Sequence, residues 1–222
     1  MAARPLAIYG GGGFGREVLQ LVRDINRREA TWDCRGFIVD RALVKTPTIQ
    51  GLPVLGDVSW LTDHPDVQVV IAIGSSADRR KVARRIAGGG RTQFATLVHP
   101  MAWVGDHVAL GPGTVLCAGT LVTTDIRIGD HVHVNLGATV GHDAVLEDFV
   151  TVNPGVHISG NVTVSEGVEL GTGSVIVPKC AIGAWSIVGA GSVVTKPLPA
   201  DTTAVGAPAR VIKERPAGWH DG

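Results

Sequence analysis

The tripeptide Gly141-His142-Asp143 places an imidazole directly before a carboxylate. An imidazole exchanges its proton near neutral pH, so it is suited to take a proton from a reacting group. The carboxylate of Asp143 can accept a hydrogen bond from one ring nitrogen and so fix the tautomer of the ring. We therefore predict that His142 and Asp143 act together as a general base.

A second group of residues could hold a phosphate. Gly10, Gly12 and Gly15 match the pattern G-x-G-x-x-G between an apolar strand and a helix, where bare backbone N–H groups bind anions. Asp40 follows Gly15 by 25 residues, about where an acid holds a ribose hydroxyl in dinucleotide-binding proteins. Taken literally, this pattern predicts a nicotinamide-dependent oxidoreductase. The alternative is a glycine loop that only allows the helix to pack closely on the strand.

The residues around His142 follow a six-residue period. Sixteen successive steps each meet an aliphatic residue: Val104, Leu110, Leu116, Val122, Ile128, Val134, Val140, Leu146, Val152, Ile158, Val164, Leu170, Ile176, Ile182, Val188 and Val194. This period fits neither a helix nor a simple two-sided strand, but it fits a short strand and a turn that repeat. Three sides close one coil of 18 residues, so we predict a β-solenoid whose coils stack by parallel pairing.

The 18-residue coil relates His142 to two other positions. Thr124 lies one coil earlier and Gly160 one coil later. Because Gly160 has no side chain, it would leave room for a substrate beside the imidazole, and its N–H could face a developing oxyanion. We therefore place Gly160 at the floor of the site.

Strands and helices alternate before the solenoid. We expect strands over residues 6–9, 32–40, 67–73 and 94–98, and helices over residues 16–28 and 76–87. This alternation predicts a small parallel α/β domain of Rossmann type. The expected domains are residues 1–98, residues 99–198 for the solenoid, and residues 199–222 as a C-terminal extension, frayed from residue 216. Fewer than 100 residues is short for a two-halved dinucleotide site.

Composition limits the classes of partner. The chain has 20 Lys+Arg and 20 Asp+Glu, which argues against a strongly basic nucleic-acid binder. The balance is 14 − 9 = +5 in residues 1–98 and 6 − 11 = −5 in residues 99–222, and a basic first part suits a phosphorylated ligand. Scattered cysteines and the lack of a long apolar run predict a cytoplasmic protein without a membrane partner. The histidine spacing predicts no metal site.

Several segments together resemble one family. They read IYGGGGFGREV, GFIVD, GLPVLGD, VVIAIGSSADRRKV, LVHP, VNLGATVGHDAVLEDF and VGAPAR. They are similar to the bacterial hexapeptide-repeat sugar O/N-acyltransferases, whose members include sialic-acid O-acetyltransferases and UDP-, GDP- or dTDP-4-amino-sugar N-acetyltransferases. The resemblance implies a Rossmann-like domain followed by a left-handed parallel β-helix, a homotrimer, and acetyl-CoA as the cosubstrate.

The resemblance also implies the roles of individual residues. The family's general base corresponds to His142, with Asp143 beside it and Gly160 next to the acetyl group. Thr151 stands where many members have a second histidine that helps to hold the acetyl group, so Thr151 or His157 would take over that task, or the group is dispensable. The nucleotide sugar would contact Gly10, Gly12, Gly13, Phe14, Asp40, Gly74, Arg79 and Asn135. Coenzyme A would contact Gly160, Thr172, Ala190, Lys196 and Arg210.

The implied function is an acetyl-CoA-dependent N-acetyltransferase that acts by direct transfer on the amino group of a nucleotide-linked 4-amino-deoxy sugar. The nearest alternative is O-acetylation of a sialic acid or a related sugar. Two further alternatives come from other classes, the oxidoreductase suggested by the glycine loop and a solenoid that serves only as a scaffold.

Overall fold

The computed structural model describes residues 2–89 and 93–221, and an α/β domain comes first in it. Its strands are β1 (Arg4–Tyr9), β2 (Trp32–Ile38), β3 (Thr48–Ile49), β4 (Leu52–Gly56) and β5 (Gln68–Ile71). Its helices are α1 (Gly13–Arg28), α2 (Ser59–Thr62) and α3 (Ser76–Gly88), with a 3-10 turn η1 at Arg41–Leu43. The sheet order is β3-β4-β2-β1-β5, parallel except for the antiparallel pair β3–β4. The predicted alternation of strands and helices is confirmed, whereas β3, β4 and α2 were not predicted. The strand expected over residues 94–98 is shorter, Leu97–Val98, and it pairs with the solenoid instead of the α/β sheet.

Helices α1 and α3 cover opposite faces of this sheet. Leu6 and Ile8 of β1 pack with α1 residues in one core, and Ala7 and Tyr9 pack with α3 residues in another. Alternate side chains of a strand point to opposite faces, so a continuous apolar strand needs a cover on both sides. The carboxyl ends of β1, β2 and β5 therefore form the edge at which the glycine loop, Asp40 and Gly74 lie.

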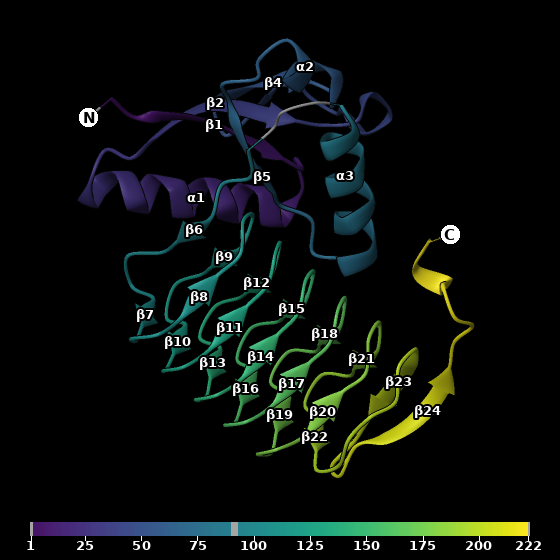
Figure 1. Cartoon of the computed structure of the whole chain (residues 1–222). Coiled ribbons are helices and arrows are strands. Elements are labelled where there is room, and N and C mark those ends of the chain that lie inside the picture. Colours follow the sequence, from purple (N-terminus) through teal and green to yellow (C-terminus); the bar gives the residue numbers. More distant parts are fainter. Residues whose placement is uncertain (1, 90–92, 222) are drawn as a thin grey trace.

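The solenoid has three sheets of short strands (Figure 1). Sheet 1 contains β6 (Leu97–Val98), β9 (Val115–Leu116), β12 (His133–Val134), β15 (Thr151–Val152), β18 (Glu169–Leu170) and β21 (Ile187–Val188). Sheet 2 contains β7 (Trp103–Val104), β10 (Leu121–Val122), β13 (Thr139–Val140), β16 (His157–Ile158), β19 (Val175–Ile176) and β22 (Val193–Val194). Sheet 3 contains β8 (Ala109–Leu110), β11 (Arg127–Ile128), β14 (Val145–Leu146), β17 (Thr163–Val164) and β20 (Ala181–Ile182).

The six-residue period is the period of the core. From Leu116 to Val194 every residue on it is at most 2% exposed. Strands of one sheet pair in parallel with a shift of 18 residues, as in Leu121↔Thr139 and Thr139↔His157. The predicted left-handed parallel β-helix is thereby confirmed.

The α/β domain lies on sheet 1. Figure 1 shows α1 and α3 next to the strands of this sheet, with β13 and β16 of sheet 2 on the far side. Leu97 and Val115 of sheet 1 share a core with Val18 and Leu21 of α1. One face of the solenoid is therefore buried by the chain's own first domain, and the other two sheets remain uncovered by it.

The C-terminal segment folds back toward α3. After β21 the chain adds β23 (Thr202–Val205) and β24 (Arg210–Glu214) to sheet 1, and a 3-10 turn η2 at Trp219–Asp221 follows. The ring of His220 stacks on Trp185 with centroids 3.9 Å apart, and Asp221 pairs with Arg80 of α3. The prediction of a frayed tail from residue 216 is wrong for the residues that the structure describes, because His220 and Asp221 both have partners.

Two buried histidines lie where the solenoid meets the α/β domain. His131 stacks on Phe149 and meets the edge of Phe94, with centroid distances of 5.1 and 4.4 Å. Burial, together with the nearby positive charge of Arg79, lowers the pKa of His131 to about 4. Burial also lowers the pKa of His133 well below its usual value. Both rings are therefore neutral at pH 7.

The low pKa of His131 predicts an acid-sensitive fold. Because this pKa lies near 4 when folded and near 6.5 when unfolded, the unfolded chain binds the extra proton, and stability falls as the pH drops through this window. At pH 5 this residue lowers the free energy of unfolding by about 2 kcal/mol.

His131→Phe, which keeps the stack on Phe149, should remove that part of the pH dependence in urea unfolding. The exposed His107, at an equivalent left-handed position, provides the control His107→Phe. Equal slopes for His131→Phe and the wild type between pH 5 and 7 would contradict this account.

Candidate active site

His142 occupies the corner that joins sheet 2 to sheet 3, two residues after the end of β13. Its Nδ1 lies 2.7 Å from Oδ2 of Asp143, and both side chains are more than half exposed. Asp143 has a φ of +59°, a left-handed conformation that short polar residues tolerate. The corner is held from both sides, because Asp143 N–H donates to Thr124 O and Asn161 N–H donates to His142 O. With Nδ1–H directed at the carboxylate, Nε2 carries the lone pair that can accept a proton.

The imidazole of His142 lies over Gly160. A Cβ added at Gly160 would stand 2.5 Å from Nε2 and 2.6 Å from Cε1 of His142. Any larger residue at position 160 would therefore push the ring away. The predicted contact between these two positions is present, and it gives the missing side chain an additional role, which is to make room for the imidazole itself. The N–H of Gly160 donates no hydrogen bond within the described part of the chain.

The glycine loop joins β1 to α1 at the carboxyl edge of the α/β sheet. Gly10 has a φ of +115°, and a Cβ there would meet Ala72 O at 2.7 Å, while a Cβ on Gly15 would meet Gly10 O at 1.9 Å. These two glycines permit close backbone packing. Gly12 and Gly13 differ, because a Cβ on Gly12 would touch nothing within 4 Å and one on Gly13 would only reach an Arg16 nitrogen at 4.0 Å. The space beside these two residues at the start of α1 is therefore open, as the predicted phosphate site requires.

Phe14 and Asp40 flank this loop. The ring of Phe14 packs on the buried His133 of sheet 1, with centroids 5.0 Å apart. Oδ1 of Asp40 accepts hydrogen bonds from the Tyr9 hydroxyl at 2.7 Å and from Nη2 of Arg85 at 2.8 Å. Burial and the hydrogen bond to Asp40 raise the pKa of Tyr9 above its usual range. Tyr9 and Arg85 were not predicted, and only their place beside the strand end connects them to the site.

Arg79 does not face a substrate. Its side chain is fully buried between the two domains. The guanidinium donates to the carbonyls of Ile73, Gly74, His131, Phe149 and Val150 and to the hydroxyl of Thr151. Burial lowers the pKa of Arg79 to about 9, so it stays protonated at pH 7. The prediction that Arg79 binds the nucleotide sugar is therefore corrected, because its donors already have partners.

Two further polar residues that were predicted for the site, Thr151 and Asn135, also lie on sheet 1 or at its corner. Thr151 is 3% exposed, and its hydroxyl is hydrogen-bonded to Gly74, Ser76 and Arg79, so it has no group left for an acetyl carbonyl of its own chain. Asn135 is buried at the corner after β12, and its amide donates to Val152 O at 2.9 Å. Asn153, one coil later, makes the equivalent bond to Leu170 O. Asn135 therefore serves the turn, as a member of a repeated pair.

The residues predicted for coenzyme A lie on two different corners. Lys196 shares the corner of His142 and Gly160, three coils after His142, whereas Thr172 and Ala190 lie at the corner between sheets 1 and 2. Arg210 begins β24, and its Nη1 bonds Ala209 O at 2.9 Å. Thr172, Ala190, Lys196 and Arg210 are all exposed. One chain therefore brings only Lys196 to the corner of Gly160, while Thr172, Ala190 and Arg210 lie elsewhere.

The base and the glycine loop lie on opposite sides of the solenoid. Sheet 1 carries the α/β domain, and the corner of His142 joins the other two sheets. In a three-sided coil that corner lies opposite sheet 1 (Figure 1). The glycine loop and His142 of one chain are therefore separated by the width of the solenoid.

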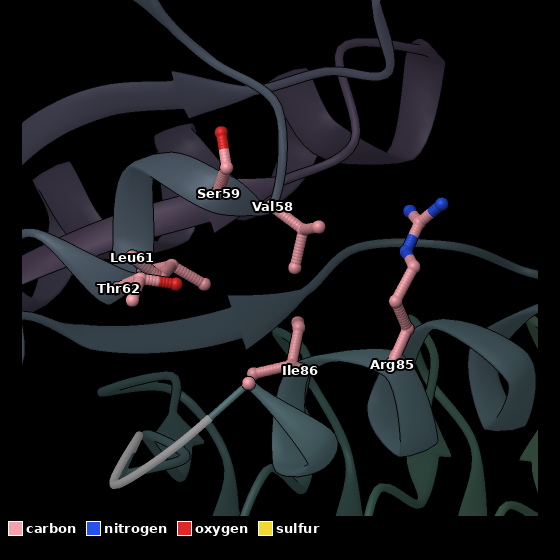
Figure 2. A pocket seen from close by; sticks show the side chains of 7 residues that line it. Val58, Ser59, Leu61, Thr62, Arg85 and Ile86 are labelled. Atoms are coloured by element: carbon pink, nitrogen blue, oxygen red, sulfur yellow. The ribbon is translucent and has the colours of Figure 1, made fainter.

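A cavity of about 230 Å³ opens between α2 and the end of α3. Its lining residues are Val58, Ser59, Leu61, Thr62, Arg85, Ile86 and Gly89. In Figure 2, Val58 and Ile86 point toward each other across it. None of the predicted site residues lines this cavity.

The described residues hold neither a metal-binding cluster nor a membrane-spanning helix. Over 2–89 and 93–221, no three side chains of His, Cys, Asp or Glu gather in a way that could hold a metal ion. In the same ranges, no helix combines the length and apolar character needed to cross a bilayer.

Comparison with known proteins agrees with this architecture. Residues 5–86 match the family described as the PglD N-terminal domain. The GDP-perosamine N-acetyltransferase of Escherichia coli O157:H7 is 32% identical over 219 residues, which cover 94% of this chain and 96% of the relative. PerB from Caulobacter crescentus, solved with CoA and GDP-perosamine, has a TM-score of 0.85 at 31% identity, covering 96% of this chain and 99% of PerB. The acetyltransferase domain of PglB from Neisseria gonorrhoeae, solved with acetyl coenzyme A, has a TM-score of 0.84 at 29% identity, covering 95% and 100%.

The contact between Gly160 and His142 predicts a specific structural change. In Gly160→Ala the new methyl group would overlap the imidazole, so the ring should turn away and lose the hydrogen bond to Asp143. The inward-facing core is untouched, so the melting temperature should change by only about 2–4 °C. A crystal structure of the variant measures the ring position. A ring that stays in place with its Nδ1–Asp143 bond intact would show that the contact does not constrain His142.

Proposed function

Because the chain belongs to the hexapeptide-repeat sugar acyltransferases, we propose that it transfers the acetyl group of acetyl-CoA to the amino group of a nucleotide-linked 4-amino-deoxy sugar. The observation that carries this proposal is the exposed His142–Asp143 pair over Gly160, within a chain that is similar to such acetyltransferases along nearly its whole length. The oxidoreductase and scaffold alternatives lack such support.

In the proposed reaction, Nε2 of His142 removes a proton from the sugar amine. The amine nitrogen then attacks the thioester carbonyl and forms the new C–N bond, while the C–S bond breaks. The departing thiolate takes the proton from the imidazolium, so the base is restored and no acyl-enzyme forms. Asp143 holds the ring and stabilises its positive charge during the transfer.

The unpaired N–H of Gly160 is the proposed donor to the oxyanion. Gly160 itself lies against the imidazole, since a Cβ on it would overlap the ring, and its N–H has no partner within the described residues. A donor that is already fixed in place stabilises the developing charge without reorganisation. Acetyl-CoA would approach along the same corner toward the exposed Lys196, whose charge suits a phosphate.

We assign nucleotide binding to residues 1–98 and catalysis to residues 99–198. The diphosphate would lie on the N–H groups of Gly12 and Gly13 at the start of α1. The first substrate to test is a GDP-linked 4-amino sugar, with UDP- and dTDP-linked ones beside it, because a relative of nearly the same length is named for GDP-perosamine. A free sialic acid is the control acceptor, and acetylation of this acceptor alone would overturn the proposal.

A complete site would need two copies of the chain. His142 and the glycine loop lie on opposite sides of one solenoid, so the loop of one protomer must meet His142 of another. We propose a homotrimer, in which each of three equivalent interfaces would form one such site.

Replacement of the base should stop turnover without loss of the fold. His142→Asn should lower kcat roughly 10²-fold or more, because no other group can take the amine proton. Its melting temperature should equal that of the wild type, since His142 is exposed. His107→Asn is the control and should keep full activity, because His107 is an exposed histidine at the same corner two coils earlier, in register with Asp143. Steady-state kinetics with acetyl-CoA and the amino sugar decide the matter, and near-normal kcat in His142→Asn would end the assignment.

The shared site predicts complementation. Gly12→Val should block the phosphate position without a clash inside the chain, so this variant and His142→Asn should each be inactive alone. After refolding as a 1:1 mixture, about one quarter of the sites would combine an intact loop with an intact base, so about a quarter of wild-type activity should return. Activity assays on the mixture, with sedimentation to confirm the assembly, test this. An inactive mixed assembly would mean that both residues serve one site within a single chain.

A further inference from the structure

The segment that follows β5, Gly74 to Ser76, is tied to the solenoid by the hydroxyl of Thr151. Oγ1 of Thr151 lies 3.0 Å from Gly74 O, 3.0 Å from Ser76 Oγ and 2.9 Å from Nη2 of Arg79. Thr151 belongs to β15 and lies 77 residues from Gly74 along the chain. These bonds therefore cross the boundary between the two domains.

The protons of this cluster can be assigned. A hydroxyl has one proton to donate and two lone pairs to accept with. Gly74 O can only accept, so Thr151 gives its proton to Gly74, and its two lone pairs receive Ser76 Oγ–H and Arg79 Nη2–H. Every position on the Thr151 hydroxyl is used within the chain, and valine, which has the same shape but no hydroxyl, could make none of the three bonds.

Arg79 and Glu169 complete the attachment of the segment. Nη1 of Arg79 donates to Ile73 O at 2.7 Å and Gly74 O at 3.1 Å, while its other nitrogens reach solenoid carbonyls. The carboxylate of Glu169, next to Thr151 on sheet 1, accepts the Ser76 N–H at 2.8 Å. Ser76 is the first residue of α3, so this carboxylate also neutralises one unpaired N–H at the helix start.

The fixed segment adjoins the glycine loop. Ala72 N–H donates to Tyr9 O at 2.7 Å, directly before Gly10, and Gly10 packs against Ala72 O. Gly74 is exposed, and a Cβ on it would meet nothing within 4 Å, as on Gly12. The solenoid thus holds one face of Gly74 while the other face stays open beside the place assigned to the nucleotide sugar.

We propose that Thr151 is a positioning residue for the nucleotide sugar, and that it acts by fixing the Gly74–Ser76 segment from the solenoid rather than by holding the acetyl group. This inference rests on the proposed function. It assigns Thr151 to the acceptor substrate, whereas the resemblance of the sequence assigns this position to the acyl donor. The difference between the two roles is measurable, because each affects a different substrate.

The test compares Thr151→Val with Thr151→Ser. Valine keeps the shape but removes the proton for Gly74 and both acceptor positions, whereas serine keeps the hydroxyl. Thr151→Val should raise the KM for the nucleotide sugar about tenfold, as the loss of a buried hydrogen bond does, with kcat and the KM for acetyl-CoA within about twofold of wild type. Thr151→Ser should resemble the wild type. Thr163→Val, at an outward position of β17 in sheet 3, is the matched control.

A second measurement does not depend on activity. Hydrogen exchange of peptides that contain residues 73–76 should be faster in Thr151→Val than in the wild type, Thr151→Ser or Thr163→Val. If Thr151→Val does not fold, Ser76→Ala, which removes the hydroxyl that donates to Thr151, should raise the same KM about threefold. An unchanged KM for the nucleotide sugar, or an effect confined to kcat or acetyl-CoA, would overturn the proposal. Failure of the wild type to acetylate any amino sugar would instead overturn the proposed function, and the exchange result would still stand.

Discussion

The 18-residue register of the parallel strands is the constraint on which the molecule depends. It places each outward residue directly beside the residue one coil away, so that Gly160 lies under His142 and Thr151 lies between His133 and Glu169. The β-helix has little freedom to adjust such contacts, because each strand pair is held by backbone hydrogen bonds on both sides. A glycine at position 160 is therefore a condition for the orientation of the imidazole, and a threonine at position 151 is small enough to lie against a neighbouring backbone.

The site residues that follow the six-residue repeat could be predicted from the sequence. The six-residue aliphatic period identified the buried positions, and adding 18 to 142 identified Gly160 as the neighbour of His142. Periodicity places residues within the solenoid, but it contains no information about what packs on the outer face of each sheet. For this reason Arg79 and Thr151 were assigned to ligands, although they bond the chain itself. Glu169 and Arg85 were missed, because their partners lie far away in sequence.

The boundary between the two domains is partly polar, although apolar contacts are found elsewhere along it. On the α1 side it is an ordinary hydrophobic contact, but on the α3 side a buried guanidinium is surrounded mainly by carbonyl groups. A buried charge without these bonds would strongly destabilise the fold. The two domains therefore keep the arrangement in which the guanidinium makes them. An apolar surface would tolerate sliding by a fraction of a residue. The hydrogen bonds of Arg79 are directional, and they fix the strand ends of the α/β sheet against defined carbonyls of the solenoid.

The return of residues 219–221 to α3 also sets an order of events during synthesis. Asp221 and Arg80 are 141 residues apart, so the ribosome completes every coil of the solenoid before this ion pair can form. The α/β domain and the successive coils can fold as they emerge, since each coil contacts mainly its neighbours. The ion pair of Asp221 with Arg80 is then made late, and it joins a late part of the chain to the much earlier helix α3. Residues 219–221 therefore pack onto α3 only after the intervening coils have been made, so a change in this contact would leave those coils free to fold.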